Sequence, residues 1–314
     1  MTAPPAPPLA VSEEVAAAQE EGRPIVALES TIVTHGLPRP QNLETARLIE
    51  AEVRQAGATP ATIAVMDGRL HIGLDEAGLA RLATAQDVDK LSRADLAACL
   101  AAGRTGATTV AATMIAARLA GIAVFATGGI GGVHRGAEST FDVSADLHEL
   151  ARTPVTVVAA GAKAILDLPK TLEVLETLGV PVIAVGQNTL PAFWSRDSGL
   201  PAPLRIDDAA GIARSHRMRA ALGLGGGQLI ANPIPAEHEI PAKTLAPLIA
   251  QATDEAAARG IAAKDVTPFL LGRVLELTEG RSLAANIALV LNNARLAAAI
   301  AREIGTTPAA PPAC

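Results

Sequence analysis

Glu29 and Lys163 are the two residues whose surroundings most favour chemistry. Glu29 ends the apolar run PIVALE, and burial of a carboxyl group favours its protonated form, which suits a general acid. Lys163 lies among small and apolar residues in VVAAGAKAIL. Burial of an amine favours its neutral, nucleophilic form, as Schiff-base chemistry requires. The residues alone also allow structural roles, with Glu29 capping the next turn and Lys163 capping a carbonyl.

A second group of polar residues lies in the segment ESTFDVSAD, residues 138–146. If this segment is extended, Asp142, Ser144 and Asp146 share one face. Two carboxylates and a hydroxyl on one face fit either a hard divalent cation with its waters or the hydroxyls of a sugar. The alternative is that Asp142 or Ser144 only caps the following helix.

The loop FATGGIGGVH, residues 125–134, is rich in glycine but fits neither common phosphate-binding pattern. His134 stands where the dinucleotide fingerprint needs its last glycine, and no GK[ST] follows. Free backbone amides, with His134 and Arg135 adjacent, predict a site for one phosphate monoester, bound by a backbone nest and a cation. The alternative is a tight turn that needs positive φ. A second cluster, GLGGGQ at 223–228, has no neighbouring cation in the sequence and predicts a turn.

These residues must be positioned by alternating strands and helices. Short apolar runs predict strands, and Ala/Leu patterns between them predict helices over Lys170–Leu178 and Ser282–Ile300. The pattern predicts a three-layer α/β/α fold with a mostly parallel central sheet. The predicted strands are Pro24–Glu29, Thr62–Met66, Ala123–Thr127, Pro154–Ala159, Pro181–Val185 and Gln228–Ala231.

Ligands of such sheets gather at the carboxyl ends of the strands. Glu29, the glycine loop and Lys163 each follow a predicted strand. We therefore expect an acid, an anion-sized loop and a lysine on one edge of the sheet, although the order of the strands is not evident from the sequence.

The composition limits the classes of partner. The 314 residues carry a net charge of −6 and only 2% aromatic residues, which argues against nucleic acid or an anionic membrane as the main partner. Cys99 and Cys314 are far apart and form no metal motif, which fits the cytoplasm. The uncharged stretch around Arg118, residues 108–133, is interrupted by glycines and favours a buried helix–turn–strand unit over a membrane span.

Both ends of the chain are rich in Pro and Ala, and the first residues do not have the pattern of a signal peptide. We expect mobile tails at residues 1–20 and 305–314, with one catalytic domain over residues 21–304 between them.

The longer motifs of the chain resemble pseudouridine-5′-phosphate glycosidases over residues 20–300. The segments that carry this resemblance are ALESTIVTHGLPRPQN, GATTVAATM, ATGGIGGVHRGAESTFDVSADL, VVAAGAKAILDLPKTLEVLETLGVPV, ANPIP and ELTEGRSLAANIALVLNNA. One departure is Glu279, which stands where the resemblance leads us to expect glycine.

The resemblance implies reversible cleavage of the C–C glycosidic bond of pseudouridine 5′-phosphate to uracil and ribose 5-phosphate. It implies Glu29 as proton donor, Lys163 as nucleophile through an imine at C1′ of the opened sugar, and Asp142 as ligand of one Mn²⁺ per subunit. It also implies a homotrimer. The implied substrate contacts are Lys90, Thr109, Val110, Thr127, His134, Ser144, Ala145, Asp146 and Asn286. The alternatives are another Schiff-base phosphosugar enzyme, an aldolase or isomerase, and a non-enzymatic phosphosugar-binding regulator.

Overall fold

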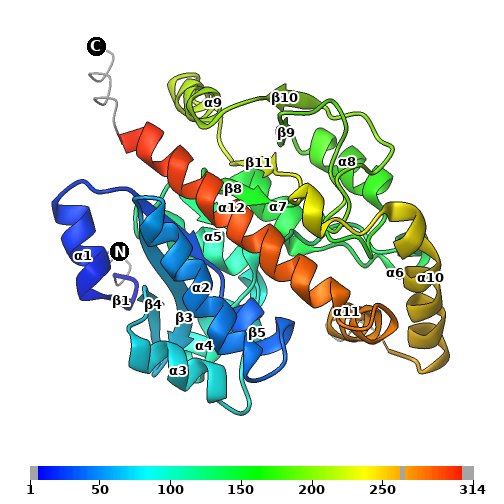
Figure 1. The fold of residues 1–314 in the computed structure, drawn as a ribbon. Helices are drawn as coiled ribbons and strands as arrows, with labels where there is room; N and C mark the ends of the chain where they lie inside the picture. The colour runs from blue at the N-terminus through cyan, green and yellow to red at the C-terminus, as the bar shows by residue number, and fades with distance from the viewer. Residues whose placement is uncertain (1–5, 262–265, 306–314) are drawn as a thin grey trace.

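The computed structural model describes residues 6–261 and 266–305, and Figure 1 shows the path of the chain. The strands are β1 Leu9–Val11, β2 Ile25–Leu28, β3 Thr59–Met66, β4 Arg69–Ile72, β5 Asp89–Leu91, β6 Gly106–Thr108, β7 Val124–Ala126, β8 Thr156–Ala159, β9 Val182–Val185, β10 Leu204–Ile206 and β11 Gln228–Ala231. The helices are α1 Glu13–Glu20, α2 Gln41–Gln55, α3 Glu76–Thr84, α4 Arg93–Ala101, α5 Val110–Leu119, α6 Ala137–Thr140, α7 Ala145–Arg152, α8 Leu168–Thr177, α9 Ala209–Ala221, α10 Ala242–Ala258, α11 Val266–Leu277 and α12 Arg281–Gly305, with short turns η1 Ile32–Gly36 and η2 Ala236–His238.

The strands form one mostly parallel sheet in the order β1-β4-β3-β2-β7-β8-β11-β9-β10, with β6 on β3 and β5 on β6. Only β4 and β6 run antiparallel to their neighbour β3. Helices α2, α12 and α9 pack together on one side, and α4, α5 and α7 on the other (Figure 1). The predicted three-layer α/β/α fold is confirmed.

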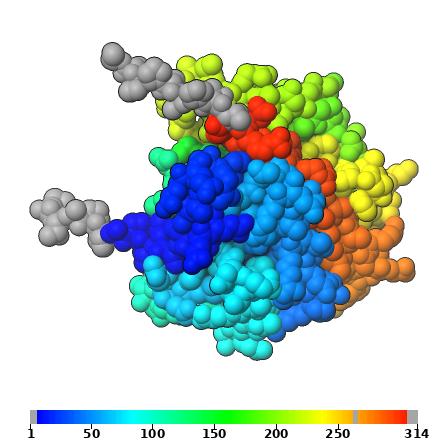
Figure 2. Space-filling model, turned by 60° about the vertical axis from the view of Figure 1, so that its left-hand side comes forward, coloured from blue at the N-terminus to red at the C-terminus, as the bar shows by residue number. Residues whose placement is uncertain are grey.

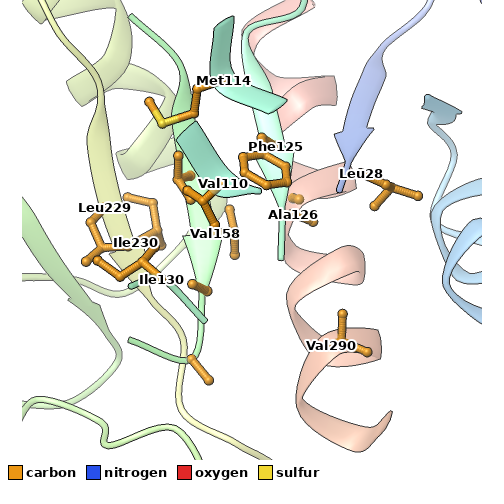
Figure 3. Close-up of a cluster of buried hydrophobic side chains, with 14 of the residues drawn as sticks. Leu28, Val110, Met114, Phe125, Ala126, Ile130, Val158, Leu229, Ile230 and Val290 are labelled. Atoms are coloured by element: carbon orange, nitrogen blue, oxygen red, sulfur yellow. The ribbon is translucent and has the colours of Figure 1, made fainter. Parts of the chain in front are cut away.

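The core is built from aliphatic side chains between these layers. Phe125, Val158 and Leu229 come from the neighbouring strands β7, β8 and β11, with Met114 of α5 and Val290 of α12 packed around them (Figure 3). Burying each such side chain contributes about 1.5–3 kcal/mol relative to its exposed state. The strands are buried on both faces, which explains why they read as continuous apolar runs.

All six predicted strands are present, with ends shifted by up to three residues. The two predicted helices are also present, as α8 and α12. Gly179 has a φ of +70° just after α8, as expected of a glycine that stops a helix. The uncharged stretch 108–133 contains α5 and β7, both buried in the core.

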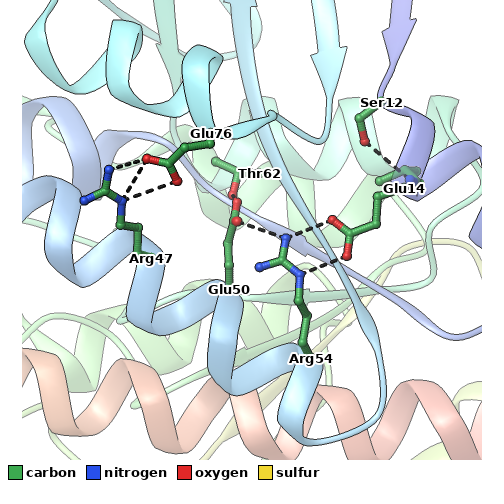
Figure 4. Close-up of polar contacts among 8 residues, drawn as sticks. Ser12, Glu14, Arg47, Glu50, Arg54, Thr62 and Glu76 are labelled. Atoms are coloured by element: carbon green, nitrogen blue, oxygen red, sulfur yellow. Dashed lines mark hydrogen bonds and ion pairs between the residues drawn. The ribbon is translucent and has the colours of Figure 1, made fainter.

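The N-terminal boundary expected at residue 20 is wrong. Strand β1 pairs with β4, and Ser12 caps α1. Arg54 of α2 then donates two hydrogen bonds to Glu14 of α1, at 2.8 and 2.9 Å (Figure 4). In Figure 2 this N-terminal segment, in blue, packs against the segments that follow it. The tail expected at 305–314 lies outside the described residues, except that Gly305 ends α12.

Among the described residues, α12 is the one helix whose length and apolar composition would allow it to cross a membrane. It packs against α9, α2 and β7, and residues such as Leu289 and Ala297 are buried there. It is therefore a core helix, and its small side chains, several of them alanines, let it approach the sheet closely.

Candidate active site

A cavity with two chambers lies at the carboxyl ends of the strands. The apolar chamber, about 80 Å³, is bordered by Ile32, Phe193 and Leu271. The polar chamber, about 260 Å³, is lined by hydroxyl, carboxylate and imidazole groups. Five residues line both chambers: Glu29, Thr31, Lys90, Lys163 and Thr267. A ligand that fills both chambers therefore has its middle beside Glu29 and Lys163.

The order of the strands in the sheet explains why Glu29 and Lys163 line the same cavity. Glu29 follows β2, the glycine loop follows β7, and Lys163 lies four residues beyond β8. These three strands are neighbours in the sheet, in the order β2-β7-β8. The prediction that an acid, the loop and a lysine share one edge is confirmed.

Two hydroxyl groups hold the carboxyl group of Glu29. Thr31 donates to Oε2, and Thr127 donates to Oε1. Thr127 is buried and does not line either chamber. In this structure the Thr127 hydroxyl therefore fixes Glu29, and its contact with substrate stays a prediction.

Lys163 is positioned by its backbone. Its amide donates to the carbonyl of Ile130 at 3.1 Å, and the preceding Ala162 bridges to the same residue. Within the described part of the chain, its half-buried ammonium group has no hydrogen bond or ion pair. The expected role as a cap of a carbonyl is not seen, and the amine faces the cavity unengaged.

Four amides of the glycine loop that the expected nest would use are already engaged within the protein. The amides of Ile130, Gly131, Val133 and His134 all donate to protein acceptors, at 2.8–3.1 Å. None of the glycines at 128, 129, 131 and 132 has positive φ, so the alternative of a positive-φ turn is also wrong.

These glycines serve close packing instead. A Cβ on Gly129 would lie 2.7 Å from the ring of Phe193. A Cβ on Gly131 would lie 2.9 Å from a carboxylate oxygen of Asp146. Side chains at these positions would push apart the walls of both chambers.

The segment 138–146 is not extended. It contains the short helix α6, then Phe141 in the left-handed region with φ +55°, then α7. Ser144 caps α7 by accepting from the amide of Asp146, as the structural alternative predicted. Asp142, Ser144 and Asp146 nevertheless all line the polar chamber.

Asp146 is buried, and both of its carboxylate oxygens accept hydrogen bonds from backbone amides. Oδ1 accepts from Ala111 at 3.0 Å, and Oδ2 accepts from Gly131 at 2.8 Å. Asp146 thereby joins α5 to the glycine loop, and its contact with substrate stays a prediction.

Two helix N-termini open on the polar chamber. Thr109 and Val110 begin α5, and Ser144 and Ala145 begin α7. The hydroxyl of Thr109 is buried and has no partner among the described residues. Together with Lys90, the partial positive charge of these two helix N-termini favours an anion in this chamber, although the first-turn amides of Ala111 and Asp146 are already bonded within the protein.

Two histidines border the cavity. Burial lowers the pKa of His134, and the charges of Lys163 and Lys90 lower it further although Asp142 opposes them. Burial and the charge of Lys90 also lower the pKa of His35. Both imidazoles are therefore neutral hydrogen-bonding groups near neutral pH.

Asn286 is oriented by a tryptophan. The indole Nε1 of Trp194 donates to Oδ1 of Asn286 at 2.6 Å. Indole nitrogen only donates, so the amide NH₂ of Asn286 is the group left for a ligand. Asn286 borders the apolar chamber, where it offers a donor to a polar ring atom.

The donor set for a metal is small. Among the described residues, no three His, Cys, Asp or Glu side chains gather as a metal site. Asp146 is engaged by amides, whereas Asp142 lies with Oδ2 3.9 Å from Nδ1 of His134. One carboxylate facing a polar chamber fits a hard cation that keeps most of its water.

Sequence reasoning missed several lining residues. They are Thr31, His35, Phe193, Thr267 and Leu271. Thr31 and His35 belong to the quoted segment ESTIVTHG, whose polar residues after a strand were a usable signal. Phe193 and the α11 residues carry no local signal, because only tertiary packing brings them to the cavity.

Comparison with known proteins agrees with this architecture. A family model for indigoidine synthase A like protein matches residues 14–303. The chain is 74% identical over 299 residues to a pseudouridine-5′-phosphate glycosidase of Jannaschia sp. (strain CCS1), covering 95% of this chain and 99% of that protein. A relative of the same name from Paracoccus denitrificans (strain Pd 1222) is 71% identical, covering 96% of this chain and all of that protein.

Solved structures share the fold. The prealnumycin C-glycosynthase AlnA, in complex with ribulose 5-phosphate, has a TM-score of 0.88 and 39% identity, covering 95% of this chain and 97% of that one. An indigoidine synthase A-like protein of Thermotoga maritima has a TM-score of 0.87 and 34% identity, covering 97% of this chain and 99% of that one.

The fold and cavity define an α/β enzyme in which a lysine and a carboxyl group line one cavity. The chain belongs to the family of indigoidine synthase A like proteins. The resemblance to its pseudouridine-5′-phosphate glycosidases is confirmed.

Proposed function

We propose that the protein reversibly cleaves the C–C glycosidic bond of pseudouridine 5′-phosphate to give uracil and ribose 5-phosphate. The observation that carries this proposal is that Glu29 and Lys163 line both chambers. The apolar chamber with the Asn286 amide suits the base, and the polar chamber suits the phosphate. The scissile bond then lies between them, beside the acid and the amine.

The phosphate binds, in this proposal, at Lys90 and the N-termini of α5 and α7. This replaces the glycine loop as the main phosphate contact, because four of the loop's amides are engaged within the protein. Ser144, Thr109 and His134 add neutral hydrogen-bonding groups around it.

The chemistry needs a proton and a nucleophile because a carbon-linked base has no lone pair at the bonding atom. Glu29, held by Thr31 and Thr127, gives its proton to the ring oxygen, and the sugar opens. The Lys163 amine bonds to C1′, and the proton that it loses goes to the carbon of the base that is linked to the sugar. The C–C bond then breaks as the nitrogen lone pair forms the imine, and the bonding pair leaves with uracil in an enol form. Water hydrolyses the remaining imine and frees ribose 5-phosphate and the amine.

Asp142 would hold one Mn²⁺ with its waters, which would supply positive charge beside the substrate. We expect Mn²⁺ titrated by calorimetry to bind the wild type and to lose at least about tenfold in affinity in Asp142→Asn. Glu138→Gln is the matched control, because this carboxylate is exposed and already paired with Lys170. Equal affinity of Asp142→Asn and wild type would contradict the assignment.

A homotrimer in the cytoplasm completes the proposal. Phe141 supports assembly, because this large apolar side chain is 85% exposed beside Asp142. The buried free Cys99 fits a reducing compartment.

Borohydride trapping tests the function. With ribose 5-phosphate and borohydride, mass spectrometry should find one reduced sugar-phosphate adduct on Lys163. Lys163→Ala should lose both the adduct and uracil release from pseudouridine 5′-phosphate. Lys243→Ala is the control, since Lys243 is exposed at the start of α10. An adduct that persists in Lys163→Ala would exclude this lysine as the nucleophile.

A further inference from the structure

A separate cavity of about 310 Å³ lies at the opposite edge of the sheet. Its walls come from the residues before β7, β8 and β11, from α9 and from the end of α5. Glu29 and Lys163 follow the carboxyl ends of their strands, whereas this cavity lies at the amino ends. We call it the amino-edge cavity; its polar side chains are Arg118, His216, Arg219 and Gln228.

The charge of the amino-edge cavity is uncompensated. No Asp or Glu lines it. Within the described part of the chain, the guanidinium group of Arg118 makes no hydrogen bond or ion pair. Arg219 donates from Nη2 to the carbonyl of Gly225 at 2.9 Å, but its buried Nε has no acceptor. Burial alone lowers the pKa of Arg219, because no carboxylate lies near enough to oppose it.

His216 adds a third donor. Its Nδ1 lies 3.0 Å from Oγ1 of Thr156. Gln228 donates its amide to the same hydroxyl oxygen at 3.1 Å, so the hydroxyl proton is available to Nδ1. The ring proton of the neutral imidazole then resides on Nε2, on the side away from Thr156.

The glycine cluster GLGGGQ, residues 223–228, forms part of the wall of the amino-edge cavity. A Cβ on Gly227 would lie 3.0 Å from the carbonyl oxygen of Thr153 and closer still to that of Val155, so the backbone here runs against the start of β8. Sequence reasoning found no cation beside this cluster. The fold brings Arg118 and His216 to it from elsewhere in the chain.

We propose that the amino-edge cavity binds a phosphate group, free or as the monoester of a small metabolite. Two guanidinium groups match the charge of a phosphate dianion, and guanidinium forks suit its oxygens. A carboxylate has only two oxygens, whereas a phosphate has enough acceptors for Arg118, Arg219 and His216 together. Binding would also give the buried Nε of Arg219 its missing acceptor.

The test is thermal unfolding in inorganic phosphate against chloride at matched ionic strength. At a phosphate concentration ten times the dissociation constant, the wild-type midpoint should rise by about 3 °C. In Lys90→Ala, which lacks the phosphate contact proposed for the active site, adding Arg118→Gln/Arg219→Gln should remove this rise. Arg214→Gln in the same background should keep it, since Arg214 is exposed on α9, the helix of Arg219, and lies outside the cavity. Arg118→Gln alone breaks no bond seen here and should weaken binding at least tenfold.

Further measurements distinguish phosphate binding in the amino-edge cavity from binding in the active site. They also show whether the amino-edge cavity binds free phosphate or a phosphate ester. Lys90→Ala alters only the active-site cavity and should retain the rise in midpoint. Comparing inorganic phosphate with ribose 5-phosphate in that variant shows whether the amino-edge cavity takes the free ion or the ester. A rise that is lost in Lys90→Ala but kept in the double variant overturns this proposal and leaves the proposed function standing. A change of oligomeric mass in Arg118→Gln, measured by light scattering, also overturns it, because the cations would then serve contacts between copies.

Discussion

The hydroxyl of Thr127 holds Glu29 without reaching the cavity itself. Thr127→Val keeps the shape of the side chain but removes this donor. We expect kcat for uracil release to fall about 10- to 100-fold with KM changed less than about threefold, since orientation of the acid is lost while substrate contacts remain.

Thr253→Val is the control for losing a hydroxyl, because Thr253 only donates to Ile249 within α10. It should leave kcat unchanged. A rise in KM with unaltered kcat in Thr127→Val would instead mean that Thr127 contacts substrate.

Sequence reasoning reaches some residue roles and not others. Glu29 and Lys163 were accessible because each follows a recognisable strand, and parallel strands end at one edge. The engagement of the glycine-loop amides was not accessible. Their acceptors include Asp146 and Thr171, which are distant from the loop in sequence. Only the tertiary structure shows that these two side chains lie beside the loop.

Between elements, Glu279 sits in the connection from α11 to α12 with a φ of +52°. A residue with a Cβ is strained in this left-handed region, whereas glycine is not, which explains why the resemblance led us to expect glycine here. Glu279→Gly should raise the free energy of unfolding by about 0.5–1 kcal/mol, because the relief of strain exceeds the added chain entropy.

Denaturant unfolding measures this change, with Glu276→Gly as the matched control. Glu276 lies in the last turn of α11 and forms an ion pair with Arg273, so glycine there should lower the free energy of unfolding by about 1 kcal/mol. Opposite signs for the two variants are expected. A loss of stability in both would mean that the connection does not strain Glu279.

The elements that sequence reasoning missed share a physical cause. Strands such as β5, DKL, and β10, LRI, have only three residues and are partly exposed. They lack a long apolar run, and pairing with a neighbouring strand creates them. The order of the strands could not be predicted either. An apolar pattern shows that a strand is buried, but it does not show which strands are its neighbours in the sheet.

Across the whole molecule, burial lowers the pKa of His35, His71, His134 and His216. The unfolded chain protonates these groups near their ordinary value of 6.5, whereas the folded chain protonates them only at lower pH. Below about pH 6.5 the unfolded state therefore binds more protons. The stability contributed by these neutral histidines is present above that pH and is lost as pH falls towards the folded pKa values.

His71 isolates this effect because it lies in β4, between β1 and β3, away from both chambers of the active site. We expect the unfolding midpoint of the wild type to fall between pH 7.5 and 5.5, and the fall to be smaller in His71→Gln, which cannot take up the proton. His148→Gln should keep the wild-type slope, since His148 is exposed on α7. Equal slopes in wild type and His71→Gln would show that the folded sheet accepts the proton at His71 as readily as the unfolded chain does. The burial of this imidazole would then have no part in the acid sensitivity of the fold.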